Sequence, residues 1–226
     1  MPIFNINEKQ FLFIHIPRTG GTCIEKWLSK EGAISFFSSN KSCAFSVSPQ
    51  HFVMRDLHLI LGESTWSYAF SIIRNPYRRI ESEYLYRTKW EYQKIQKRPQ
   101  FSTWLINQLN LASEHRCHLD NHLRPQTDFI DEGVELFYFE DGLDRIAQEV
   151  SRKIGVKAPG ELSVVNESHP SEVTWTLEAY NEFHRFYAND FDQLDFPRVK
   201  PSLNIRRKSD AHEKGRFRLR YPMSRV

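Results

Sequence analysis

The sequence predicts an α/β fold in three layers, with a mainly parallel sheet between helices. Strand-like apolar runs alternate along the chain with amphipathic helical patterns, which is the order of elements in parallel α/β domains. The two most apolar runs, at 11–16 and 68–73, have the composition of buried strands, and each leads through a turn into a helix.

The first half of the chain alternates strands and helices in a regular order. Ile24, Trp27 and Leu28 share one face of a helix, and Asn75-Pro76 combines an N-cap with a proline at the first helical position. The expected elements are strands at 11–16, 33–37 and 68–73 and helices at 22–30, 52–61 and 76–96.

The second half is expected to hold a strand at 134–139 and helices at 101–109, 143–154 and 171–191. Gly155 suits the left-handed position that ends a helix. Because no linker or repeat interrupts the pattern, we expect one domain over residues 1–197, followed by a tail over 198–226.

The composition is that of a soluble globular chain, with 40% apolar and 26% charged residues among 226. No apolar run approaches the roughly 20 residues that cross a bilayer, and no leader-like segment opens the chain. The three cysteines have no CxxC spacing, so we expect neither a disulfide framework nor a metal site. A reducing cytoplasm fits this pattern.

Charge is unevenly distributed. The tail from Arg198 onward has ten Lys and Arg residues against two Asp and Glu, about +8, while the remaining residues, 21 against 26, total about −5. A basic tail suits a nucleic acid, a membrane or a phosphorylated ligand, or it is a solvated end.

The first candidate site is the turn Pro17-Arg18-Thr19-Gly20-Gly21-Thr22, between a strand and a helix. Glycines let the backbone approach a ligand, and a helix N-terminus offers unpaired N–H groups to an anion. Arg18, Thr19 and Thr22 add a cation and two hydroxyls, which together favour phosphate or sulfate. The turn is not a Walker A loop, because the GxxxxGK[ST] pattern is absent.

The second candidate site begins where the strand 68–73 ends. Arg74 follows that strand directly, and Ser82 lies about two helical turns further on. Open α/β sheets bind ligands at this edge, where an arginine can grip a phosphate through two hydrogen bonds.

These two sites resemble the motifs of sulfotransferases that use 3′-phosphoadenosine-5′-phosphosulfate (PAPS), most closely those of the carbohydrate-directed, family-2 type. FIHIPRTGGTCIEKWL resembles their 5′-phosphosulfate loop, and IIRNPYRRIESEY resembles their 3′-phosphate motif, RxPxxRxxSxY. Further similarity lies at His122–Gln126, Tyr138–Asp141 and Asn166–Ser168. Arg18 for the commoner lysine and Cys23 for serine are departures.

The resemblance implies a P-loop-kinase-like fold and metal-free transfer of a sulfuryl group from PAPS to a hydroxyl acceptor, with carbohydrate favoured. Arg18 would also act in catalysis, Arg74 and Ser82 would hold the 3′-phosphate, and Cys23 would offer its backbone N–H. The implied donor-binding residues are Arg18, Thr19, Gly20, Gly21, Thr22, Cys23, Arg74 and Ser82, and weaker substrate contacts are His122, Arg124 and Gln126.

The general base is expected to be a histidine. Relatives of this type use a histidine in the region of His51, and imidazole titrates near neutrality. His122 and Glu63 are alternatives, while His15 lies within an apolar strand and is expected to be packed and hydrogen-bonded.

Two other functions remain open at this stage. A nucleotide kinase would need a Walker lysine and a Mg²⁺-binding carboxylate, which the motifs do not provide. A non-catalytic module would bind a nucleotide or a sulfated glycan through the basic tail. We expect no nucleic-acid partner, and the sequence carries no signal for an oligomeric state.

Overall fold

The computed structural model describes residues 1–40, 44–62, 66–162, 173–199 and 216–217. The chain divides into two compact units, the first comprising 1–75 and 116–167 and the second 76–115 and 168–226. Most of the basic tail, as well as Glu63 and Asn166–Ser168, lies outside the described residues.

The first unit is built on a five-stranded mixed sheet with the strand order β3-β1-β2-β4-β5. Its strands are β1 (Ile3–Ile6), β2 (Lys9–Ile14), β3 (Ala33–Ser35), β4 (Tyr68–Ile73) and β5 (Glu135–Tyr138). β2, β4 and β5 run parallel, whereas β1 is antiparallel to both β2 and β3. The α/β prediction is therefore confirmed, and the mainly parallel sheet is corrected to a mixed one.

β1 was not expected from the sequence. It pairs with β2 across the two-residue turn Asn7-Glu8, where φ is +49° and +62°. A turn with positive φ at both central residues is typical of tight hairpins, and its usual signal is Asn-Gly. Glu8 in the place of glycine hides this signal.

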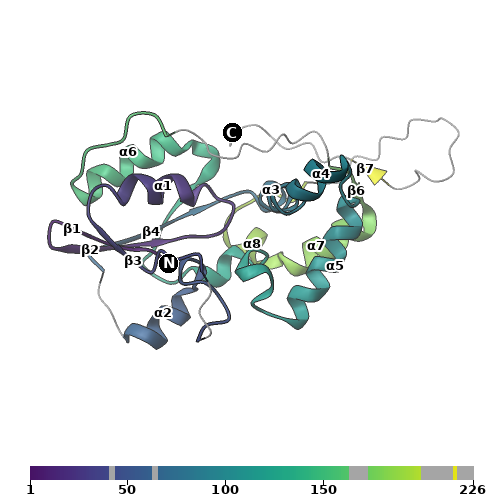
Figure 1. Cartoon of the computed structure of the whole chain (residues 1–226), viewed down its shortest axis with the longest axis horizontal. Coiled ribbons are helices and arrows are strands. Elements are labelled where there is room, and N and C mark those ends of the chain that lie inside the picture. Colours follow the sequence, from purple (N-terminus) through teal and green to yellow (C-terminus); the bar gives the residue numbers. More distant parts are fainter. Residues whose placement is uncertain (41–43, 63–65, 163–172, 200–215, 218–226) are drawn as a thin grey trace, which may run out of the picture. The chain divides into compact units, whose positions relative to one another are not determined.

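Helices lie on both sides of this sheet (Figure 1): α1 (Gly21–Leu28) and α6 (Leu143–Ile154) on one side and α2 (Met54–Leu61) on the other. α1 and α6 pack against Phe13, Phe70 and Phe137 in one hydrophobic cluster. α6 ends as expected at Gly155, which is left-handed with φ +73°.

The second unit is mainly helical. It contains α3 (Pro76–Arg87), α4 (Lys89–Ile95), α5 (Phe101–Glu114), α7 (Leu177–Phe186) and α8 (Ala188–Gln193), with a short pairing of β6 (Trp175–Thr176) and β7 (Arg216–Phe217). Its core is aromatic: Tyr77, Trp175 and Phe183 are fully buried, with ring centroids 5.1–6.0 Å apart.

Two long helices of the prediction are each interrupted. The expected helix 76–96 breaks at Thr88, whose hydroxyl donates to the Tyr84 carbonyl at 2.8 Å, a contact that bends helices. The expected helix 171–191 begins only at Leu177, because Trp175 and Thr176 pair as a strand, and it breaks again at Tyr187.

His184 makes the stability of the second unit depend on pH. Its Nε2 is hydrogen-bonded to the hydroxyl of Tyr77, with the two atoms 2.6 Å apart. Burial, helped by the charge of Arg198, lowers the pKa of His184 from 6.5 to about 4. The unfolded chain therefore binds this proton more readily, so stability is complete above pH 6.5 and falls as the pH drops towards 4.

We expect the urea concentration at the unfolding midpoint to decrease as the pH is lowered from 7 to 4.5. The decrease should be smaller in His184→Gln. Glutamine keeps a hydrogen-bonding group at this position but does not titrate. Equal pH slopes in the two proteins would assign the acid sensitivity to other groups.

Candidate functional site

The first unit brings the two candidate junctions to one edge of its sheet. β2 and β4 are parallel neighbours, with Phe13 opposite Phe70 and Ile14 opposite Ser71. The Ser71 hydroxyl also donates to the Ile14 carbonyl at 2.8 Å, close to the carboxyl ends of both strands. The loop after β2 and Arg74 after β4 therefore emerge side by side.

The loop between β2 and α1 is tightly folded. Arg18 and Gly20 are left-handed, with φ +69° and +86°, and a Cβ on Gly20 would lie 2.9 Å from Leu143. The hydroxyl of Thr19, which is fully buried, donates to the Ile16 carbonyl at 2.8 Å. Thr19 therefore shapes the loop from within.

α1 starts at Gly21, and no side chain caps its N-terminus. Thr22 is exposed there. The N–H of Cys23, which is predicted to meet the donor, donates to the Gly20 carbonyl at 3.0 Å, and its side chain is buried in the core. Any anion at this turn would meet the N–H groups of Gly21 and Thr22 instead.

Arg74 is held against the loop by several contacts. Its Nη1 donates to the Arg18 carbonyl at 3.1 Å, and its guanidinium carbon lies 4.3 Å from the centre of the Phe139 ring. The Gln126 amide bonds to both the N–H and the C=O of Arg74, at 2.9 and 2.8 Å. Gln126 is fully buried, and its amide fixes the backbone of Arg74.

Ser82, the other predicted 3′-phosphate contact, belongs to the second unit. It lies on α3 and is buried.

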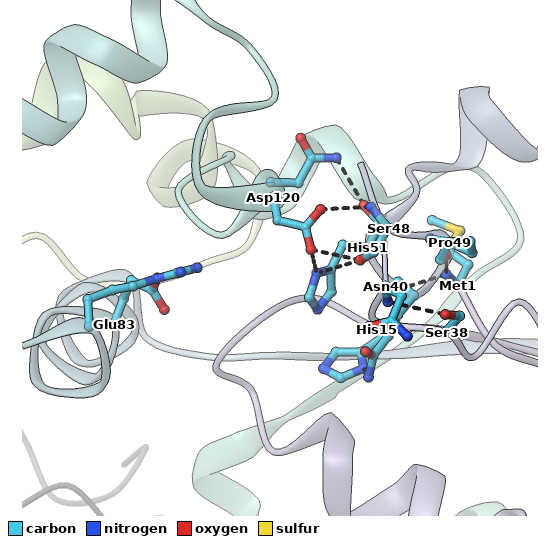
Figure 2. A network of polar contacts seen from close by, with 12 residues as sticks. Met1, His15, Ser38, Asn40, Ser48, Pro49, His51, Glu83 and Asp120 are labelled. Atoms are coloured by element: carbon cyan, nitrogen blue, oxygen red, sulfur yellow. Dashed lines mark hydrogen bonds and ion pairs between the residues drawn. The ribbon is translucent and has the colours of Figure 1, made fainter. Parts of the chain in front are cut away.

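A second group of polar residues surrounds His51 (Figure 2). The His51 Nδ1 and the Asp120 Oδ2 are 2.8 Å apart. Ser48 donates to the two oxygens of Asp120 through its N–H and its hydroxyl, each at 2.7 Å. The His122 ring meets that of His51 edge-on, with centroids 4.8 Å apart.

Asp120 reaches His51 through an unusual backbone. Leu119, Asp120 and Asn121 are consecutive left-handed residues without a glycine, with φ of 51°, 62° and 64°. This conformation costs about 1–2 kcal/mol for a residue such as Leu119 and less for aspartate and asparagine, which adopt it more readily. The Asn121 amide donates to the His51 carbonyl at 2.9 Å and so holds this turn in place.

The protonation states in this group follow from its geometry. Burial lowers the pKa of His51 to about 3, so its imidazole is neutral at pH 7. Burial acts to raise the pKa of Asp120, but hydrogen bonds from His51 and Ser48 outweigh this and hold that pKa well below its usual range. An ionised carboxylate only accepts, so the His51 Nδ1 carries the proton and its Nε2 has the lone pair.

His15 connects this group to the loop. As expected, it is buried and hydrogen-bonded: its Nδ1 pairs with Glu25, and the Gln50 amide contacts both His15 and Glu25, at 3.1 and 2.8 Å. The His15 ring lies 5.4 Å from that of His51. On its other side, the ring reaches the backbone of Gly21.

Sequence reasoning missed several of these residues. Asp120 and Ser48 were missed because their hydrogen bond joins segments that are 72 residues apart in the chain. Glu25 is a charged residue beside the apolar positions of α1, and His15 is a polar residue within an apolar strand. Two such residues could have been predicted to pair with each other, as they do. Arg124, a weak substrate candidate, forms an ion pair with Asp128 at 2.9 Å.

Comparisons with known protein families, with curated proteins and with solved structures find no match for this chain. Among the helices that the structure describes, none has the length and apolar character needed to span a membrane.

The contact between Gly21 and His15 can be tested by substitution. A Cβ at residue 21 would lie 2.7 Å from the Cδ2 and Nε2 atoms of His15. We expect Gly21→Ala to lower the free energy of unfolding by about 1–3 kcal/mol through overpacking. Gly160→Ala is the matched control, because its added Cβ meets no atom within 4 Å. Equal urea midpoints for the two variants would contradict the expected overpacking at residue 21.

Proposed function

We propose that this chain is a PAPS-dependent sulfotransferase that transfers a sulfuryl group to the hydroxyl of an acceptor, with carbohydrate the favoured class. The observation that carries the proposal is the contact between the two junctions, in which Arg74 donates to the backbone of Arg18 at 3.1 Å. The motifs that resemble the 5′-phosphosulfate loop and the start of the 3′-phosphate motif are thus adjacent within one unit.

The chemistry of the loop fits an anionic donor. The uncapped N-terminus of α1 offers N–H groups, and Arg18 and Arg74 supply positive charge beside it. During transfer, the bond between sulfur and the 5′-phosphate oxygen breaks while the acceptor oxygen bonds to sulfur. The role of Arg18 and the loop N–H groups is to stabilise the negative charge that develops on the leaving phosphate.

His51 is the proposed general base. Its Nε2 carries the lone pair that accepts the acceptor hydroxyl proton, while Asp120 holds the Nδ1–H and stabilises the imidazolium that forms. The pKa of about 3 makes the free imidazole a weak base, but the negative charge of a bound donor raises the pKa of a neighbouring imidazole. Asp120 is thus a positioning residue.

The role of Arg74 can be tested by donor binding. We expect Arg74→Ala to weaken the binding of adenosine 3′,5′-bisphosphate by roughly 10- to 100-fold. The binding of AMP should weaken much less, because AMP has no 3′-phosphate. Arg145→Ala, at an exposed arginine of α6, is the matched control for the loss of one positive charge. Titration calorimetry measures these affinities. Equal losses for both nucleotides would remove Arg74 from the 3′-phosphate role.

The role of His51 can be tested by turnover. With labelled PAPS and a panel of glycans, lipids and phenols, we expect His51→Ala to lower kcat by roughly 10²–10⁴ while donor affinity is kept. His58→Ala, at an exposed histidine, is the control. Asp120→Asn should lower kcat more than it changes KM. If His122→Ala alone abolished turnover, His122 would be the base.

Two outcomes would replace the proposal. ATP that competes as well as adenosine 3′,5′-bisphosphate would favour a nucleotide kinase. Donor binding without transfer to any acceptor would favour a non-catalytic module.

A further inference from the structure

The group around His51 also has the composition of a metal site. One ligand atom each from His51, Asp120 and His122 lies within 4.8 Å of the others. Two imidazole nitrogens and one carboxylate oxygen are a common donor set for zinc and other divalent transition metals. Three protein ligands leave at least one position open for water or substrate.

The distances are close to those of a coordinated ion. Ligand atoms about 2.1 Å from one tetrahedral ion lie roughly 3.4 Å apart. The His51 Nδ1 and the Asp120 Oδ2 are 2.8 Å apart and need to separate slightly. Since all three ligand atoms lie within 4.8 Å of one another, none of them needs to approach another by more than about 1.4 Å.

The surroundings of Asp120 resemble the outer shell of a metal site. Ser48 donates to both carboxylate oxygens, and such second donors orient ligating carboxylates. The carboxylate of Glu25 is already hydrogen-bonded to His15 and to the amide of Gln50. Arg124 lies near Asn121, but its charge is paired with Asp128. The carboxylate of Asp120 is the negative charge that a cation at the cluster would contact directly.

We propose that His51, Asp120 and His122 bind one divalent transition-metal ion of the Zn²⁺ class. On binding, the ion takes the place of the proton on the His51 Nδ1, which is released to solvent, while Nε2 takes up a proton from solvent, so that the imidazole stays neutral. The consequence for activity rests on the proposed function: an ion held by His51 prevents this residue from accepting the acceptor proton, so Zn²⁺ is a reversible inhibitor of the transfer and not its cofactor.

Zinc binding is measured by titration calorimetry on the full chain after treatment with EDTA, without any donor. We expect one Zn²⁺ per chain, with at least tenfold weaker binding in His122→Ala and in Asp120→Asn. His115→Ala, which removes an exposed histidine outside the cluster, should bind as the unchanged chain does. Mg²⁺ should not bind, because it prefers oxygen ligands.

A second readout covers the case in which a variant folds poorly. Saturating Zn²⁺ should raise the Tm of the unchanged chain and of His115→Ala, because a ligand of the native state stabilises it, but not that of His122→Ala. Circular dichroism without metal establishes whether each variant is folded. Zinc binding that is equal in all folded variants would overturn the proposal.

The two proposals fail in different ways. If the chain binds Zn²⁺ at the cluster but transfers no sulfuryl group, the metal site stands and the proposed function falls. If transfer proceeds but is unaffected by Zn²⁺, the inhibitory role is wrong. Transfer that is lost with EDTA and restored by Zn²⁺ would also overturn it, because the ion would then be a cofactor.

Discussion

The candidate site depends on the parallel pairing of β2 with β4. In a parallel pair both carboxyl ends lie at the same edge, so two segments more than 50 residues apart leave the sheet together. The bond from Ser71 to the Ile14 carbonyl ties the ends, and Arg74 then reaches the backbone of Arg18. A slip of this register by one residue would turn the side chains of β4 to the opposite face.

Around this edge, polar side chains are hydrogen-bonded in two adjacent sets. His15, Glu25 and Gln50 form one set, and Ser48, His51 and Asp120 form the other. An unpaired buried carboxylate would be costly, whereas hydrogen bonds from neighbouring donors offset the cost of burial. Gly21 lies close to the His15 ring, which links the first set to the loop. The packing at Gly21 and the hydrogen bonds of His15 therefore depend on each other.

The sequence predicted what local signals encode. β4, the start of α3 at Pro76 and the end of α6 at Gly155 follow from apolar runs, proline and glycine, and the placement of Arg74 beside the loop follows from strand order. β1 was missed because its turn lacks glycine. The partnership of Asp120 with His51 was missed because it joins segments 69 residues apart through a left-handed turn, which no local pattern encodes.

Charge bears on how the proposed anionic donor would be held at this edge. The residues before the tail carry about −5 net charge, which would repel an anionic donor at long range. At physiological salt, however, exposed charges are screened beyond about 8 Å, so only nearby groups decide whether an anion binds. For the proposed donor, these groups on the loop side would be Arg18, Arg74 and the first N–H groups of α1. The contacts from Gln126 and Phe139 therefore matter because they hold one of the two cations where its charge remains effective.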